Sequence, residues 1–484
     1  MRVAFLIPPA LDGTGNVDRW IGCNYSFYFL PIPAVLYSAT LLKNTVEGIS
    51  IADLAAHRKT EKDFLGFASS DDSDVYVFYT VFLSQKTDQR ARHIIREMKP
   101  DSKFIFCGPH PTLEADLFLD RDDTFVARGE PEFIIRELVE ALKKGNDVGS
   151  IKGVSYRRNS RVINNPSALP IENIDDIPVP DRTLLDHRPY CNPKLHVGPH
   201  TSALTSRGCY GRCWFCVPNS LSYSREVEYK KEHRRKPPPR LHSPKRVVEE
   251  FSDISRLGLR SVSILDDEFL WDEKRTLEIC DGIKDLGLAW SCIARPDKVT
   301  EHTARAMAGA GCVYIDLGME SFDEEILDSI GKDMSPADTE RAVDILKAQN
   351  IKVEINVIFG ATPKETETTM KKTLKAVRRI NPDYALFNIA NPYPGTEFYE
   401  AAKREGWMVS GDYVPTDAMK SSIISYPHLS KRKLERFIAY AYFTYYYLNP
   451  RYLLRQLVQI RSLREFGNKF FAALRFFVKN FIKR

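Results

Sequence analysis

The run Arg-Gly-Cys-Tyr-Gly-Arg-Cys-Trp-Phe-Cys-Val-Pro carries three cysteines within eight residues, Cys209, Cys213 and Cys216. Three thiolates at spacings of four and three residues can bind three irons of one iron–sulfur cube and leave the fourth iron without a protein ligand. Structural metal sites normally have four protein ligands, whereas a site that lacks one is built to bind a substrate or cofactor. The spacing therefore predicts a reactive cluster.

The alternative is a zinc knuckle completed by His196, His200 or His233. None of these histidines lies at a zinc-finger spacing from the cysteines, which favours the cluster. The other six cysteines occur singly along the chain, which argues against a disulfide framework; they are Cys23, Cys107, Cys191, Cys280, Cys292 and Cys312.

The spacing Cys-x3-Cys-x2-Cys resembles the signature of the radical S-adenosylmethionine (SAM) superfamily. This resemblance implies that SAM chelates the open iron of a [4Fe–4S] cluster. An electron passed into its sulfonium then releases a 5′-deoxyadenosyl radical, which abstracts hydrogen from an unactivated carbon. Trp214 and Phe215 lie between the last two cysteines and would cover the cluster with apolar surface, with Phe215 beside SAM. Ordinary core packing of the two rings is the alternative.

Composition places the chain among soluble globular proteins, with 484 residues, 43% hydrophobic and 27% charged, enough for two or three domains. The run from Met1 to Pro9 predicts a first strand and not a signal peptide, so a cytoplasmic location is expected. The net charge of +5 is concentrated at the end. From Arg451 onward there are nine basic residues and one acidic residue, so the remainder carries −3. This distribution argues against nucleic-acid binding.

Short apolar runs alternate with helical segments over residues 1–150 and predict a parallel, doubly wound α/β sheet. The strands are expected at Val3 to Ile7, Ile49 to Asp53, Val75 to Tyr79, Phe104 to Cys107 and Thr124 to Ala127. Ligands bind such sheets at the carboxyl ends of the strands. Thr80, Gly108-Pro109-His110 and Gly129-Glu130 follow three of these ends.

These turns resemble those of the flavodoxin-like (Rossmann-type) cobalamin-binding domain that precedes the core in one branch of the superfamily. The resemblance implies that Thr80, Gly108, Pro109, His110, Gly129 and Glu130 bind cobalamin. The Asp-x-His-x-x-Gly motif, with which many cobalamin proteins supply a histidine to cobalt, is absent, so that lower ligand would be missing. A flavodoxin-like domain without a cofactor is the alternative.

An ordered, proline-rich connector is expected over 151–200, followed by a radical SAM core over 201–410. Six strands are expected in the core, which makes an incomplete (β/α)6 TIM-like barrel with its chemistry at the carboxyl ends. These strands are Thr201 to Ser206, Ser261 to Leu265, Leu288 to Ile293, Val313 to Leu317, Lys352 to Phe359 and Tyr384 to Ile389.

Polar residues follow these strands in the order that the family resemblance implies for SAM binding. Asp266, Asp267 and Glu268 would bind the amino group, Arg295 the carboxylate through its planar fork, and Glu320 with Ser321 the ribose. The turn Gly360 to Glu365 resembles the family's Gly-x-Pro-x-Glu turn, but Thr362 is inserted before the proline, which puts its adenine contact in doubt. Taken singly, each carboxylate is better explained as a helix N-cap or a solvated loop residue, but five such matches in order behind the cysteines favour the family resemblance.

Two basic segments remain. Arg225 to Arg246 surrounds three prolines, and we expect it either as an extended cationic rim near the active site or as a solvated loop. Residues 411–484 form a helical region rich in basic and aromatic residues. Near its end an apolar stripe opposes a cationic one, which predicts a helix lying on a membrane surface. Docking of that helix on the barrel is the alternative. The stripe comprises Phe470, Leu474, Phe477, Val478 and Phe481.

Together these features predict a cobalamin-dependent radical SAM enzyme that most simply methylates an unactivated carbon of a hydrophobic, lipid-like substrate. The branch resembles anaerobic magnesium-protoporphyrin ester cyclases and hopanoid-associated radical SAM proteins, so ring closure or other carbon–carbon bond formation on a lipid or tetrapyrrole is an alternative. A non-catalytic iron–sulfur sensor is another. The expected partners are a flavodoxin- or ferredoxin-type electron donor and a membrane surface.

Overall fold

The computed structural model describes residues 1–20, 22, 24–26 and 28–458. By its internal contacts the chain divides into two compact units. The first comprises residues 1–210, 217–293 and 305–313. The second comprises residues 211–216, 294–304 and the described residues from 314 onward. The domain boundaries expected near 150, 200 and 410 stay predictions.

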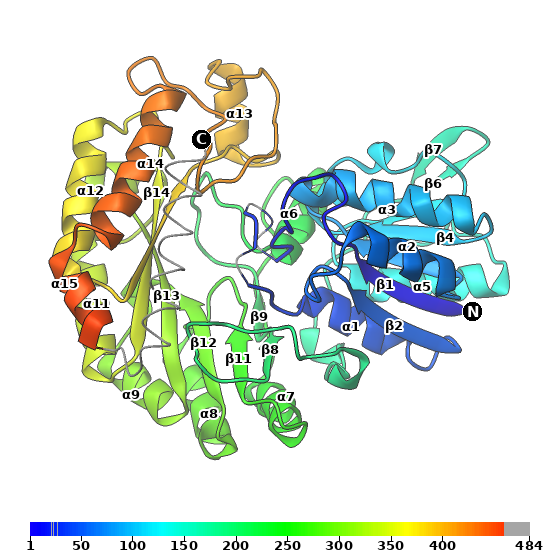
Figure 1. Cartoon of the computed structure of the whole chain (residues 1–484), viewed down its shortest axis with the longest axis horizontal. Helices are drawn as coiled ribbons and strands as arrows, with labels where there is room; N and C mark the ends of the chain where they lie inside the picture. Colours follow the sequence, from blue (N-terminus) through cyan, green and yellow to red (C-terminus); the bar gives the residue numbers. More distant parts are fainter. Residues whose placement is uncertain (21, 23, 27, 459–484) are drawn as a thin grey trace. The chain divides into compact units, whose positions relative to one another are not determined.

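The first unit opens with a sheet of seven strands in the order β2-β1-β3-β4-β5-β6-β7 (Figure 1). Strands β1 to β5 are parallel to one another. Strand β6 pairs antiparallel with β5, and β7 pairs antiparallel with β6. The parallel order 2-1-3-4-5 is that of a flavodoxin-like doubly wound sheet, so the predicted N-terminal fold is confirmed. The strands are β1 (Arg2–Ile7), β2 (Gly48–Asp53), β3 (Val75–Tyr79), β4 (Lys103–Cys107), β5 (Thr124–Ala127), β6 (Val154–Arg158) and β7 (Arg161–Asn164).

Alternate residues of each strand point to opposite sides of this sheet, and a core cluster covers each side of its central strands. Val3 and Phe5 share one core cluster with residues of α1 and α5, and Leu6 shares the other with residues of α2 and α3. Continuous apolar strands are the expected consequence of burial on two faces. The helices are α1 (Pro33–Leu42), α2 (Glu61–Ser70), α3 (Gln85–Met98), α4 (Pro109–Leu113) and α5 (Pro131–Lys144).

The β6–β7 hairpin lies in the segment expected as a connector. Its two central residues, Asn159 and Ser160, have positive φ angles of 50° and 62°, which matches the tight turn that joins two antiparallel strands. Neither residue is glycine, so no strong turn signal marks this position in the sequence. The hairpin extends the first sheet beyond β5.

The first unit also contains three parallel strands in the order β8-β11-β12, close to the predicted positions. The expected strand from Thr201 to Ser206 is interrupted after Ala203 because Thr205 N–H donates to Asp266 instead of to a neighbouring strand. The elements are β8 (His200–Ala203), β9 (Ser206–Arg207), α6 (Ser220–His233), β10 (Arg240–Leu241), α7 (Pro244–Arg256), β11 (Ser261–Ile264), α8 (Glu273–Ile283) and β12 (Ala289–Ala294).

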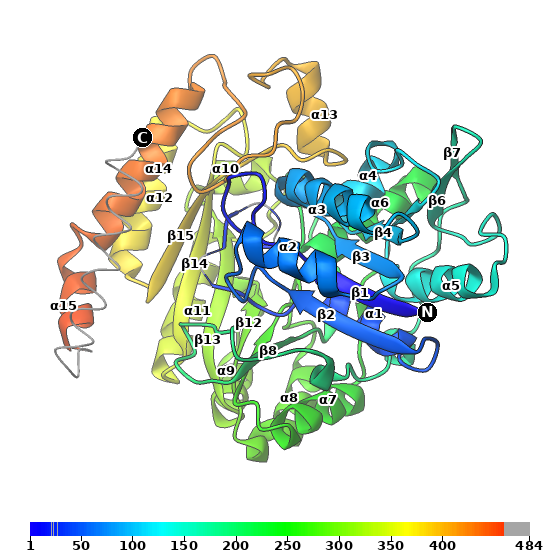
Figure 2. The same ribbon diagram turned by 45° about the vertical axis from the view of Figure 1, so that its right-hand side comes forward.

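The second unit is built on three parallel strands in the order β13-β14-β15, with α12 and α14 beside them (Figure 2). Their predicted positions are confirmed, and β13 is longer at both ends. The elements are α9 (Glu301–Gly309, which spans both units), β13 (Cys312–Glu320), α10 (Glu324–Ser329), α11 (Pro336–Ala348), β14 (Lys352–Phe359), α12 (Glu367–Ile380), β15 (Tyr384–Ile389), α13 (Glu397–Arg404), α14 (Lys431–Tyr446) and α15 (Pro450–Val458).

The tyrosine-rich run of α14 covers the open edge of β15. The Tyr442 hydroxyl accepts from Phe387 N–H at 3.1 Å and donates to the carbonyl of the same residue at 2.9 Å. Tyr446, one helical turn later, makes the same pair of bonds to Ala385. These rings complete an edge strand, so they are not available to a membrane. The amphipathic stripe from Phe470 to Phe481 lies outside the described residues. Within residues 1–458, apart from 21, 23 and 27, no helix is long and apolar enough to cross a membrane.

The basic segment after the cysteines is helical over its first part, so the expectation of an extended segment was wrong there. The Asn219 side chain caps α6 by accepting from Ser222 N–H, and most of the helix is buried down to Glu228. Lys230 and Lys236 pair with Glu226. Lys231 pairs with Glu228, so three of the cations have an acidic partner in α6, whereas Arg234 and Arg235 are exposed. The three prolines begin only after α6 has ended.

Candidate functional site

The predicted cluster ligands lie on one loop that contains no regular secondary structure. Cys209, Cys213 and Cys216 are partly exposed thiols, and Cys216 N–H donates to the Cys213 carbonyl at 3.1 Å. Over the described part of the chain, no three His, Cys, Asp or Glu side chains are grouped closely enough to hold a metal ion. The fit of an iron–sulfur cluster rests on the chemistry of this donor set, since three accessible thiols on one short loop are the donors that such clusters use.

Both ends of this loop are held by the carboxyl end of β11. Asp267 accepts from Gly208 N–H at 2.9 Å and from Asn219 N–H at 2.9 Å, residues that lie just before and just after the three cysteines. Asp266 accepts from the N–H and hydroxyl of Thr205, and burial raises the pKa of Asp266 to about 6 although these bonds lower it. Glu268 accepts from Leu270 N–H. The three acids predicted to bind SAM thus already serve the local fold, and SAM binding by them stays a prediction.

The tip of the loop belongs to the second unit and is held through Trp214. Its N–H donates to the Ile330 carbonyl at 3.1 Å, its carbonyl accepts from Phe398 N–H at 3.1 Å, and its indole Nε1 donates to the Ala361 carbonyl at 2.8 Å. Phe215 beside it is half-buried. Trp214 therefore anchors the loop to the turn after β14, which is a more specific role than apolar cover.

Lys332 is a buried cation in the second unit that the sequence did not single out. Its Nζ donates to Glu320 Oε1 at 3.0 Å, where β13 bulges against β14. Burial opposes the charge of Lys332, but the Glu320 carboxylate and the Cys213 thiol outweigh burial and raise its pKa. A fixed positive charge beside a cluster ligand can bind a carboxylate. The only signal in the sequence was a Gly-Lys pair after a short helix.

Other predicted SAM residues of the second unit are buried near the ends of their strands. Arg295 donates to the Asp333 carbonyl at 2.7 Å and to Asp297 at 2.9 Å. Glu320 has a φ of 70°, a strained backbone for a residue other than glycine, of a kind that concentrates at functional sites. The hydroxyl of Ser321 lies 3.2 Å from that of Thr373. The structure places all three at carboxyl ends, as the barrel interpretation expects.

The six positions predicted to bind cobalamin are all buried. Gly108 has a φ of 101°, and a Cβ there would lie 2.7 Å from the Thr80 carbonyl oxygen, so glycine is required for the close approach of β3 and β4. Thr80 donates to Asp88, and Glu130 accepts from Ile171 N–H and pairs with Arg240. Among these six positions, which include Pro109, His110 and Gly129, one buried polar side-chain atom lacks a hydrogen bond, and it is His110 Nδ1.

Helix α6 covers this carboxyl edge. The Tyr79 hydroxyl bonds Ser220 at 2.8 Å, Glu228 accepts from Arg128 at 2.9 Å, and the ring of Tyr223 lies against Phe82. Most of the residues predicted to contact cobalamin therefore serve packing within the first unit. Of the six, His110 has a buried ring nitrogen, Nδ1, that is left to bond a ligand. Cobalamin binding by the six positions stays a prediction.

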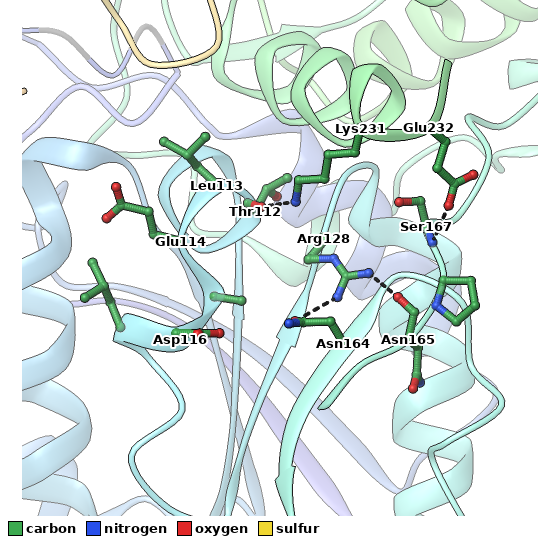
Figure 3. A pocket seen from close by; sticks show the side chains of 13 residues that line it. Thr112, Leu113, Glu114, Asp116, Arg128, Asn164, Asn165, Ser167, Lys231 and Glu232 are labelled. Carbon is green, nitrogen blue, oxygen red and sulfur yellow. Dashed lines mark hydrogen bonds between the residues drawn. The ribbon is translucent and has the colours of Figure 1, made fainter. Parts of the chain in front are cut away.

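A cavity of about 620 Å³ lies beside this edge (Figure 3). Its two cations are already engaged: Arg128 donates to Asn165 and other acceptors, and Lys231 donates to Glu228 and the Thr112 carbonyl. The cavity offers no unpaired cation to an anionic ligand at these two positions. Its wall is formed by residues 112–117, Arg128, residues 164–167, Lys231 and Glu232.

Comparison with known proteins matches residues 204–377 to the radical SAM superfamily. An uncharacterised methyltransferase of Pyrococcus horikoshii is 28% identical over 95% of both chains. The anaerobic magnesium-protoporphyrin IX monomethyl ester cyclase of Rubrivivax gelatinosus is 27% identical over 64% of this chain and 55% of its own length. The hopanoid C-3 methylase of Methylococcus capsulatus is 25% identical over 78% of this chain and 69% of its own length.

Two solved structures share the fold. The cobalamin-dependent SAM radical enzyme OxsB, with aqua-cobalamin and SAM bound, superposes with a TM-score of 0.70 over 98% of this chain and 70% of its own, at 16% identity. The radical SAM methyltransferase TsrM of Kitasatospora setae, with cobalamin and a [4Fe–4S] cluster bound, gives 0.66 over 90% of this chain and 84% of its own, at 16% identity. The α/β architecture is thus the one expected from the sequence.

Proposed function

We propose that this chain, whose residues 204–377 match the radical SAM superfamily, is a radical SAM enzyme that methylates an unactivated carbon of a hydrophobic, lipid-like substrate. The domain implies a [4Fe–4S] cluster and SAM. The observation that carries the methylation proposal is likeness along 95% of the chain to a protein named as a methyltransferase. The shared fold with cobalamin-bound enzymes supports cobalamin as a further cofactor.

When bound, the cluster and SAM supply a carbon-centred radical, and cobalamin supplies a transferable methyl group. The residues of this chain would hold and orient these groups. Cys209, Cys213 and Cys216 would ligate the cluster, while Lys332 and Arg295 would hold the SAM carboxylate by charge and paired hydrogen bonds. Glu320, whose carboxylate accepts from Lys332, would fix that cation in place.

The hydrophobic substrate is supported by two relatives, whose names specify a protoporphyrin ester and a hopanoid. Both substrates are large and apolar, which is consistent with the membrane contact that we propose for the basic tail. The same relatives include a cyclase, so ring closure remains the second candidate for the reaction on such a substrate. A flavodoxin or ferredoxin would supply the electron.

The test is an anaerobic incubation of reconstituted protein with cobalamin, a strong reductant and SAM labelled in its methyl group with deuterium, in the presence of lipids and tetrapyrroles extracted from the source cells. Methylation predicts 5′-deoxyadenosine and an apolar product heavier by one labelled methyl group. A product that forms without label would indicate cyclisation. Absence of 5′-deoxyadenosine under several reductants would contradict the catalytic proposal, and the Cys213→Ala variant gives the background.

A further inference from the structure

The strand before the cysteine loop and the helix after it meet at one carboxylate. Asp267 Oδ2 accepts from Gly208 N–H at 2.9 Å, and Oδ1 accepts from Asn219 N–H at 2.9 Å and from the Asn219 side-chain amide at 2.7 Å. The Ser222 hydroxyl in the first turn of α6 donates to Oδ2 as well. Residues 209–218, which include all three cysteines, lie between the two backbone amides that Asp267 binds.

We propose that Asp267 is a positioning residue that holds both ends of the cysteine loop and so sets the spacing of the cluster ligands. The proposal rests on the proposed function only in taking the three cysteines as cluster ligands. It also assigns Asp267 a role other than binding the SAM amino group, because four donors of the chain already occupy its two oxygens.

Three features make this carboxylate effective. Hydrogen bonds from backbone amides to an ionised carboxylate are shorter and stronger than those between neutral groups. Bringing three thiols of a flexible ten-residue loop to one metal centre costs conformational entropy. Fixing both ends of the loop beforehand lowers that cost. Asp266, its neighbour at the end of β11, binds Thr205, so the strand entering the loop is held at a second point.

The loop end is also held on its other side. Arg207, the residue before Gly208, is buried and donates to Glu132 at 2.7 Å, and Arg225 of α6 donates to the Arg207 carbonyl at 3.1 Å. A side chain at Gly208 would lie 2.2 Å from the Arg225 guanidinium. The backbone that enters the cysteine loop therefore has little freedom to shift. Because Asp267 bonds both Gly208 and Asn219, it fixes the two ends of the loop relative to each other.

The experiment compares full-length wild type, Asp267→Asn and Asp175→Asn. Asp175 is a matched control because it too accepts a backbone N–H, from Ser243 at 3.1 Å, and a side-chain bond from His242, and neither partner belongs to residues 208–219. Each protein is reconstituted anaerobically, passed over a chelating column and analysed for iron and sulfide. The reduced cluster is then recorded by electron paramagnetic resonance with and without SAM.

Loss of a residue that orients metal ligands typically weakens metal binding by about 10- to 100-fold. Asp267→Asn should therefore lose most of its iron on the column and show an altered resonance on adding SAM, while Asp175→Asn behaves as wild type. Equal iron retention and equal spectra in all three proteins would overturn the proposal.

Hydrogen exchange of the metal-free wild type supplies a measurement that needs no variant. The amides of Gly208 and Asn219 should be protected in wild type, and Asp267→Asn should lose this protection. If the amides of Gly208 and Asn219 are both unprotected in wild type, the proposed role of Asp267 is overturned, even where Asp267→Asn fails to fold. If wild type itself binds no cluster, the proposed function fails, whereas the exchange result still decides the role of Asp267.

Discussion

The buried carboxyl group of Glu365 should make the stability of the second unit depend on pH. Glu365 is fully buried; its Oε2 accepts from Gly360 N–H at 2.8 Å, and its Oε1 accepts from the Thr369 hydroxyl at 3.4 Å. Burial raises its pKa from 4.5 to about 8, although both hydrogen bonds lower it, and the negative charge of Asp323 adds to the rise. At neutral pH the folded protein therefore keeps this carboxyl group protonated.

The sign of the effect follows from proton binding. Because the folded state binds the proton more tightly than the unfolded chain, stability is fully present below pH 4.5, falls as the pH rises and stops falling near pH 8. With about 1.4 kcal/mol per pKa unit, the loss between pH 4 and pH 7 is about 3 kcal/mol. Glu365→Gln keeps the neutral shape and the acceptor for Gly360 and has no proton to lose.

The assay is urea unfolding of the metal-free, reduced full-length protein at several pH values, followed by tryptophan fluorescence. The difference in unfolding free energy between Glu365→Gln and wild type should grow in favour of the variant by about 3 kcal/mol from pH 4 to pH 7. The exposed Glu324→Gln is the control and should show no such trend. A difference for Glu365→Gln that stays constant with pH, or that grows in favour of wild type, would refute the reasoning.

Three further changes test the fold and the tail. Gly108→Ala should lower the unfolding free energy by about 1–3 kcal/mol, because φ is 101° and the new Cβ would meet a carbonyl oxygen; Gly145→Ala, with no atom within 4 Å, should cost less in the same thermal unfolding assay. Tyr446→Phe removes both bonds to the β15 edge and should cost about 1–3 kcal/mol, whereas the exposed Tyr440→Phe should change little, and equal effects would contradict the edge role. Deleting residues 459–484 should abolish co-sedimentation with anionic vesicles, and unchanged binding would reject membrane contact by the tail.

The sequence predicted the sheet strands well because burial on two faces leaves an unmistakable apolar run. Val75–Tyr79 and Tyr384–Ile389 begin and end where expected. The β6–β7 hairpin was missed because neither turn residue is glycine, and α6 was missed because the Pro237-Pro238-Pro239 run masked the helical segment before it. Local composition cannot show which neighbour a segment will pack against.

Site residues were harder to assign than strands. Spacing alone singled out the three cysteines, but it could not distinguish a carboxylate that binds a ligand from one that holds the backbone, as Asp267 does. Likewise the aromatic richness of residues 411–484 did not show that the hydroxyls of Tyr442 and Tyr446 bond the edge of β15. Lys332 became notable only through its contact with Glu320, which no sequence pattern specifies.

The central claim is that Cys209, Cys213 and Cys216 hold a [4Fe–4S] cluster with one iron open to SAM. Mössbauer spectroscopy of iron-57 protein, reconstituted without oxygen, tests it most directly. We expect about four irons per chain, of which one changes its isomer shift when SAM is added, and no cluster after replacement of any of the three cysteines. Zinc in place of iron, or a cluster whose four irons all remain unchanged with SAM, would contradict it.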